Sequence, residues 1–91
     1  MNIKVKCYVN GDVFLEDREA YPFKEDNRLA YFKDEIGWKL TDLQTGMFVV
    51  TGHTKKAMLE AWEQKKFQYY ELIKKDVYRK KVAEFERIQH L

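Results

Sequence analysis

Residues 54–91, TKKAMLEAWEQKKFQYYELIKKDVYRKKVAEFERIQHL, decide the fold. This run of 38 residues contains neither proline nor glycine, and Thr54 can cap a helix because its hydroxyl accepts from a free N–H of the first turn. Apolar and aromatic residues recur at spacings of three and four along its first half: Ala57, Met58, Ala61, Trp62, Tyr69, Leu72 and Ile73. At about 100° per residue they share one sector, which predicts a helix packed on an apolar surface.

The apolar sector changes direction after Lys74. Four residues project from another side of the same helical count, turned by more than ~90°: Val77, Tyr78, Phe85 and Ile88. Two explanations remain open: Asp76 caps a second helix after a break at Lys74-Lys75, or one long helix overruns the sheet and buries these residues against another chain. A single helix would span about 57 Å, roughly twice the width of so small a domain. We favour association, as a homodimer or by docking on a partner.

The first hairpin is predicted from residues 3–16, where alternating apolar residues indicate a half-buried strand and a return strand. Asn10-Gly11-Asp12 is the turn signal between them. We expect all three turn residues to form the loop, because Lys6 then lies opposite Glu16 as a charged pair. A loop of two residues would set Lys6 opposite Leu15.

Residues 17–27 read as a connecting loop that is long for a domain of this size. Tyr21 and Phe23 flank Pro22, the only proline. We expect these two aromatic side chains to pin the loop to the edge of the sheet, with an exposed recognition element as the alternative.

Three further strands are predicted at residues 29–33, 38–43 and 47–51. Gly46 stands where a three-residue hairpin loop needs a left-handed residue. In the resulting register Leu40 lies opposite Val50 and Asp42 lies opposite Phe48.

The predicted fold is therefore α+β within a single domain of residues 1–91. An antiparallel sheet of four or five strands covers residues ~3–51, within a sheet segment of 1–52. A long C-terminal helix, or two helices, then covers residues ~54–90 of the helical segment 54–91 and packs on one face of the sheet.

Composition indicates a soluble domain with an uneven charge distribution. The chain has 91 residues, 45% of them hydrophobic, which is enough for a core. The formal net charge is +2, but residues 54–91 alone carry 10 basic and 6 acidic side chains. One cysteine forms no internal disulfide, and no apolar run approaches the ~18 residues of a membrane span. We expect a cytoplasmic protein with no membrane segment.

No motif for catalysis, metal binding or a cofactor is recognisable. The four glycines are isolated turn residues, so a phosphate-binding loop is excluded. His53 and His90 lie far apart, without cysteine or carboxylate neighbours at metal-ligand spacing. Cys7 lies on the apolar face of its strand, where a thiol is most often an inert hydrophobic residue. We expect no enzyme, no metal site and no cofactor.

The first functional hypothesis is a non-catalytic protein-protein interaction module. The predicted binding residues form the second apolar stripe together with one tyrosine: Tyr70, Val77, Tyr78, Phe85 and Ile88. The chain also resembles, in its general texture, the small accessory proteins of phages and mobile elements, being short, charged and built as a sheet plus a helix. That resemblance implies a protein that binds and inhibits a host enzyme, such as a defence nuclease.

The alternative hypothesis is a nucleic-acid-binding accessory protein. Its predicted contacts are helix lysines and sheet aromatics: Lys74, Lys75, Lys80, Lys81, Tyr8 and Phe14, with Phe32 as a further aromatic candidate. Interleaved acidic residues weaken this basic surface, so we rank the hypothesis second.

Overall fold

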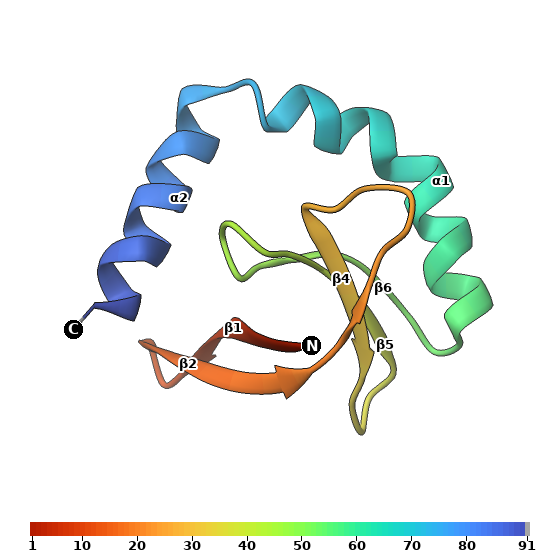
Figure 1. The fold of residues 1–91 in the computed structure, drawn as a ribbon, viewed down its shortest axis with the longest axis horizontal. Helices are drawn as coiled ribbons and strands as arrows, with labels where there is room; N and C mark the ends of the chain where they lie inside the picture. Colours follow the sequence, from red (N-terminus) through yellow and green to blue (C-terminus); the bar gives the residue numbers. More distant parts are fainter. Residues whose placement is uncertain (91) are drawn as a thin grey trace.

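The computed structural model describes residues 1–90 and shows three layers (Figure 1). The middle layer is a four-stranded antiparallel sheet in the order β3-β4-β5-β6, formed by Tyr21–Pro22, Leu29–Lys33, Trp38–Asp42 and Phe48–Gly52. One face packs against α1 (Lys55–Leu72), and the other packs against the hairpin of β1 (Asn2–Val9) and β2 (Asp12–Glu19). The helix α2 (Asp76–Gln89) turns back toward the hairpin, so the two helices form an arc around the sheet (Figure 1). The predicted α+β fold is confirmed, with the strands divided between two antiparallel sheets.

The β1–β2 hairpin corrects the predicted three-residue loop. Val9 pairs with Asp12, so only Asn10 and Gly11 form the turn, with φ of 52° and 85°. Two successive residues with positive φ make a type I′ turn, whose twist matches that of the two strands, and Asn-Gly is the dipeptide that adopts it most readily. The register therefore sets Lys6 opposite Leu15, not opposite Glu16.

The segment predicted as a connecting loop is only partly loop, because residues 17–19 and 21–22 belong to strands. β2 continues to Glu19, and Tyr21–Pro22 then pairs with β4 as β3, the outer strand of the larger sheet. Proline is compatible with an outer strand because it has no N–H to donate to a neighbour. Phe23 is buried and its ring lies 5.7 Å from the ring of Trp62, edge to face. Phe23 thus pins the segment as expected, whereas Tyr21 stays exposed against Tyr31.

The turn between β5 and β6 contains the predicted left-handed glycine. Gly46 has φ of 69°, and Leu40 lies opposite Val50 as expected. The predicted pair of Asp42 with Phe48 is wrong, because a β-bulge after Leu40 sets Phe48 opposite Thr41.

The helix α1 follows its predicted pattern. Thr54 Oγ1 accepts from the N–H of Ala57 at 3.0 Å, so the hydroxyl caps the first turn. Met58, Trp62 and Tyr69 are the buried residues of α1, and they pack against the sheet in one core cluster. The Trp62 indole N–H donates to Glu25 Oε2 at 2.8 Å, which ties α1 to the segment before β4.

The helical segment breaks, so the long helix that we favoured is wrong for the described residues. The folded chain measures 36 × 31 × 25 Å, and a straight helix of about 57 Å would leave much of its length without a surface to pack on. The turn at residues 73–75 lets α2 bury Tyr78 and Phe85 within the same chain. Lys75, not Asp76, is the N-cap residue, and no side chain caps α2. Leu91, the last residue of the predicted segment, lies outside the described residues.

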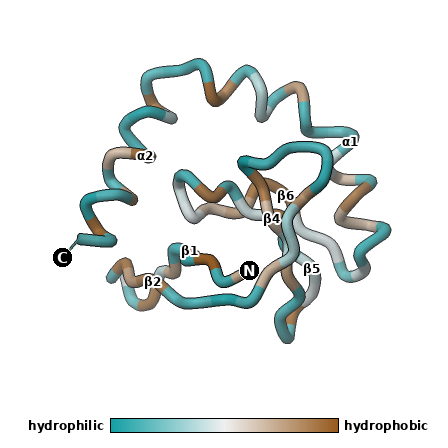
Figure 2. Tube along the Cα trace, viewed as in Figure 1, coloured by the Kyte–Doolittle hydropathy of each residue, from teal (hydrophilic) through white to brown (hydrophobic). Residues whose placement is uncertain are grey.

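The second apolar sector packs on the β5–β6 turn. Phe85 lies directly over Gly46: a Cβ on this glycine would approach Phe85 Cε1 to 2.5 Å. Gly46 therefore meets two requirements at once, a positive φ and space for the ring. The Lys6 ammonium, whose side chain is fully buried, reaches Glu84 Oε1 at 3.0 Å and joins β1 to α2. Figure 2 shows the resulting distribution of hydropathy, with hydrophilic residues at the connection between the helices.

Candidate protein-binding groove

A groove lies where the end of α1, the start of α2 and the start of β6 meet. Its volume is about 380 Å³, at the low end of the roughly 300–1,000 Å³ of small-molecule pockets. Its walls are mainly apolar, and Met47, Leu72 and Val77 are 37%, 43% and 51% exposed. Met47 comes from the β5–β6 turn, Leu72 from the end of α1 and Val77 from the start of α2. The groove exists only because α2 turns back beside α1.

The exposed apolar side chains differ from the core residues next to them. Val49, the bulge residue of β6, is half-buried and packs against the α1 core. Phe48 also borders the groove, but its ring lies 6.1 Å from the ring of Phe32, toward the hairpin layer. Phe48 is nevertheless 43% exposed, so four apolar side chains of the groove are open to a partner: Met47, Phe48, Leu72 and Val77.

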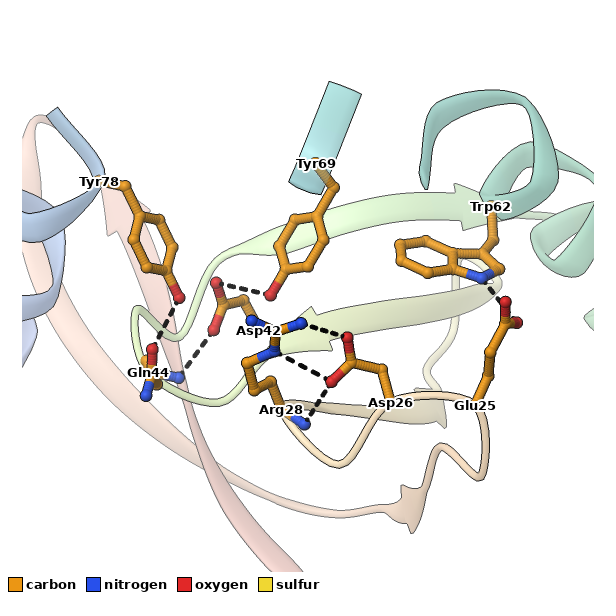
Figure 3. A network of polar contacts seen from close by, with 8 residues as sticks. All are labelled: Glu25, Asp26, Arg28, Asp42, Gln44, Trp62, Tyr69 and Tyr78. Carbon is orange, nitrogen blue, oxygen red and sulfur yellow. Dashed lines mark hydrogen bonds and ion pairs between the residues drawn. The ribbon is translucent and has the colours of Figure 1, made fainter. Parts of the chain in front are cut away.

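The floor of the groove is a polar network (Figure 3). Tyr69 Oη donates to Asp42 Oδ2 at 3.3 Å, and the Gln44 backbone N–H donates to Asp42 Oδ1 at 2.8 Å. Tyr78 Oη donates to Gln44 Oε1 at 2.9 Å, so α1 and α2 are both bonded to the β5–β6 turn. This network holds the two helices at a defined separation across the groove.

Both tyrosines of the floor remain protonated at neutral pH. Burial raises the pKa of Tyr69 well above its usual range, and the nearby Asp42 carboxylate raises it further. Burial raises the pKa of Tyr78 in the same way, again with Asp42 as a second cause. The two phenols therefore act as hydrogen-bond donors within the network.

The ion pair between Arg28 and Asp26 lies near the network (Figure 3). Arg28 Nε donates to Asp26 Oδ1 at 3.0 Å, and Arg28 Nη2 donates to Asp26 Oδ2 at 2.8 Å. These bonds lower the pKa of the Asp26 carboxyl, while partial burial opposes them. The Arg28 guanidinium also lies 5.7 Å from the centroid of the Tyr70 ring. The loop before β4 is thus connected to α1 beside the groove.

The residues predicted to bind a partner are divided by the structure. Tyr78 and Phe85 are buried within the chain, which corrects the premise of an unburied stripe. Tyr70 is half-buried with its ring 5.8 Å from that of Trp62, and Ile88 is half-buried on α2. Of the five predicted residues, Val77 is both exposed and part of the groove.

The residues of the nucleic-acid hypothesis do not form one surface. Tyr8 lies opposite Val13, whereas Phe14 lies opposite Cys7, so the two exposed rings stand on different faces of the hairpin. Phe32 is buried between the sheet and the hairpin, so it is not available for stacking. The lysines lie elsewhere, in the connection between the helices and in the first half of α2: Lys74, Lys75, Lys80 and Lys81.

Sequence reasoning missed Met47, Leu72 and Lys65 as groove residues. Met47 reads as the first residue of a strand, and Leu72 reads as part of the buried helix face. No local signal could have found them, since each becomes part of a groove only when α2 folds back. The bulge and the returning helix are tertiary features.

The remaining candidates for chemistry are the thiol of Cys7 and possible metal ligands. Cys7 is half-buried, and burial raises the pKa of its thiol, with Glu16 adding to the shift. Among residues 1–90, no group of three histidine, cysteine or acidic side chains is arranged to hold a metal ion. Within the same residues, neither helix has the length and apolarity needed to cross a membrane.

Comparison of the chain with family models, with curated proteins and with solved structures found no match.

Proposed function

We propose that this chain is a non-catalytic protein-binding module that holds a segment of another protein in the groove between α1 and α2. The observation that carries the proposal is a set of exposed apolar side chains around one concave site: Met47, Phe48, Leu72 and Val77. A contiguous exposed apolar surface in a small domain is typical of an interaction site. Grooves between helices are a recurrent place for such segments to dock.

The finer proposal is that binding inhibits the partner, as in a phage-like accessory protein that blocks a host enzyme such as a defence nuclease. Its support is the texture of the chain, a short charged domain, together with a groove that α1, α2 and the β5–β6 turn hold through the Asp42 network. A pre-organised site binds with less ordering cost than a flexible one. A cytoplasmic setting is part of the same proposal, supported by a single cysteine.

The test is selection of binding peptides from a displayed random library, followed by affinity measurements on variants. Leu72→Ser with Val77→Ser removes two anchoring contacts and should weaken the selected peptides about tenfold or more. The matched control is Ile36→Ser with Phe67→Ser, which changes two exposed apolar residues outside the groove. Thermal unfolding of both variants checks that the fold is retained. Equal binding by the groove variant and the control would refute the groove as the site.

The second candidate function is nucleic-acid binding through the lysines at the start of α2. Lys75 and Lys80 are exposed and have no ion-pair partner among residues 1–90. Fluorescence anisotropy with labelled DNA and RNA over a salt series tests this function, since phosphate contacts give a log–log slope near −0.9 per duplex phosphate neutralised. Charge reversal of Lys74, Lys75, Lys80 and Lys81 should then remove the binding. A salt-independent or absent signal would eliminate the candidate.

A further inference from the structure

The groove has a positive charge on each helical wall. Lys65 projects from α1 and Lys81 from α2, and both border the apolar surface. Lys65 is exposed and has no ion-pair partner among the described residues. Its charge is therefore available to whatever occupies the groove.

The charge of Lys81 is also largely available to whatever occupies the groove. Its ammonium lies 3.8 Å from Glu84 Oε2, whereas the other oxygen of the same carboxylate accepts from Lys6 at 3.0 Å. The Lys6 side chain is fully buried, so this bond cannot be exchanged for water without leaving a buried charge. Glu84 is thus held by Lys6, and the hydrogen bond from Lys6 is the main cause of the lowered pKa of the Glu84 carboxyl.

Negative charge within the groove is confined to its floor. Asp42 is the one acidic residue among those that line the site, and it is 2% exposed. Each of its carboxylate oxygens already accepts a hydrogen bond, one from Tyr69 and one from the Gln44 backbone. An incoming chain therefore meets apolar walls and two lysines.

We propose that the occupant is an acidic segment of another protein, with a large apolar side chain between carboxylates that reach Lys65 and Lys81. This inference rests on the proposed protein-binding function and gives the chemistry of its partner. Complementary charges on a rim raise the association rate and reject partners of the wrong sign, while the apolar anchor supplies most of the affinity.

The observations disfavour a second copy of the chain and a nucleic acid as occupants. A symmetric contact through this site would bring Lys65 and Lys81 of one copy toward the same lysines of the other, and like charges at an interface are costly. A phosphate backbone would pair with the lysines but would leave Met47, Leu72 and Val77 without apolar contacts.

The experiment scores the charge of peptides selected from the displayed random library and compares two double charge reversals. Lys65→Glu with Lys81→Glu reverses the rim, and Lys56→Glu with Lys80→Glu makes the same change in net charge on the same two helices outside the groove. The expected result is enrichment of Asp and Glu around a large apolar residue. We also expect binding to weaken about tenfold or more in the rim variant and to change less than about threefold in the control.

Five outcomes would overturn the inference. Selected peptides that are neutral or basic would contradict an acidic occupant, as would equal losses in the two charge-reversal variants. If Leu72→Ser with Val77→Ser removes binding but the rim reversal does not, the proposed function stands and the acidic occupant fails. Concentration-dependent dimerisation that the rim reversal enhances would identify a second copy as the occupant. A library that yields no groove-dependent peptide would refute the inference and the proposed function together.

Discussion

The two helices are attached to the sheet in different ways. The start of α1 is capped by the Thr54 hydroxyl, and its Met58, Trp62 and Tyr69 enter the main core. In contrast, α2 has no side-chain cap and buries only Tyr78 and Phe85. Its polar connections are the ion pair between Lys6 and Glu84 and the hydrogen bond from Tyr78 to Gln44.

Because of this difference, α1 mainly affects the stability of the domain, whereas α2 mainly affects the shape of the groove. Residues of α1 stabilise the whole domain, because they form the shared core with β4, β5 and β6. Residues of α2 determine where the second wall of the groove stands. The region closest to the proposed function is thus the less firmly packed of the two, as is common for binding elements.

The largest expected effect is on the α1 side. Trp62→Ala should lower the free energy of unfolding by about 4–5 kcal/mol, because a fully buried ring and its edge-to-face contacts are lost. Chemical denaturation measures the change. A loss below about 1 kcal/mol would contradict the central place of α1 in the core.

A smaller and more local effect is expected on the α2 side. Phe85→Ala should lower the free energy of unfolding by about 3 kcal/mol, because the ring leaves a cavity over Gly46. Hydrogen exchange should accelerate in α2 much more than in α1, since α2 can detach while the α1 core stays intact. Equal acceleration in both helices would show that they unfold as one unit and would remove the distinction.

Local patterns predicted the parts of the fold that depend on near neighbours. The apolar sector of α1, the Thr54 cap and the positive φ of Gly46 follow from residues a few positions apart. The pairing of Leu40 with Val50 follows from the alternation along two adjacent strands.

The wrong predictions concern features that depend on residues far apart in the sequence or on the backbone conformation of a turn. We assigned Lys6 to a cross-strand pair with Glu16, but its partner is Glu84, 78 positions away. The hairpin register followed the positive φ values that Asn10 and Gly11 adopt, not the pairing of charges. The return of α2 depends on the fit of Phe85 over Gly46, which no periodicity records. The groove residues could not be predicted for the same reason.

Substitutions at the N-caps of the two helices should change the free energy of unfolding in opposite directions. Thr54→Ala should cost about 1 kcal/mol, because the Ala57 N–H loses its acceptor. Lys75→Asp should gain about 0.5–1 kcal/mol, because the backbone of Lys75 is already extended and an aspartate there can accept from the first turn of α2. Thermal unfolding of the two variants measures both changes. If the Lys75→Asp variant is no more stable than the original, the backbone N–H groups in the first turn of α2 gain nothing from an added acceptor.

The smallest expected effect concerns pH and the ion pair between Arg28 and Asp26. Hydrogen bonds from Arg28 lower the folded-state pKa of Asp26 below its ordinary value of 3.8. The stabilisation is therefore fully present above that value, and it is lost as the pH falls through the folded-state pKa. Because Arg28 is 38% exposed, solvent screens the pair, and we expect a contribution of roughly 0.5–1 kcal/mol. Asp26→Asn should lower stability near neutral pH and leave it almost unchanged once the pH is below the folded-state pKa of Asp26, so that the two unfolding curves converge in acid. Curves that stay parallel from neutral pH to acid would show that the carboxylate charge contributes nothing. The loop before β4 would then depend on Trp62 and Phe23 for its attachment to α1.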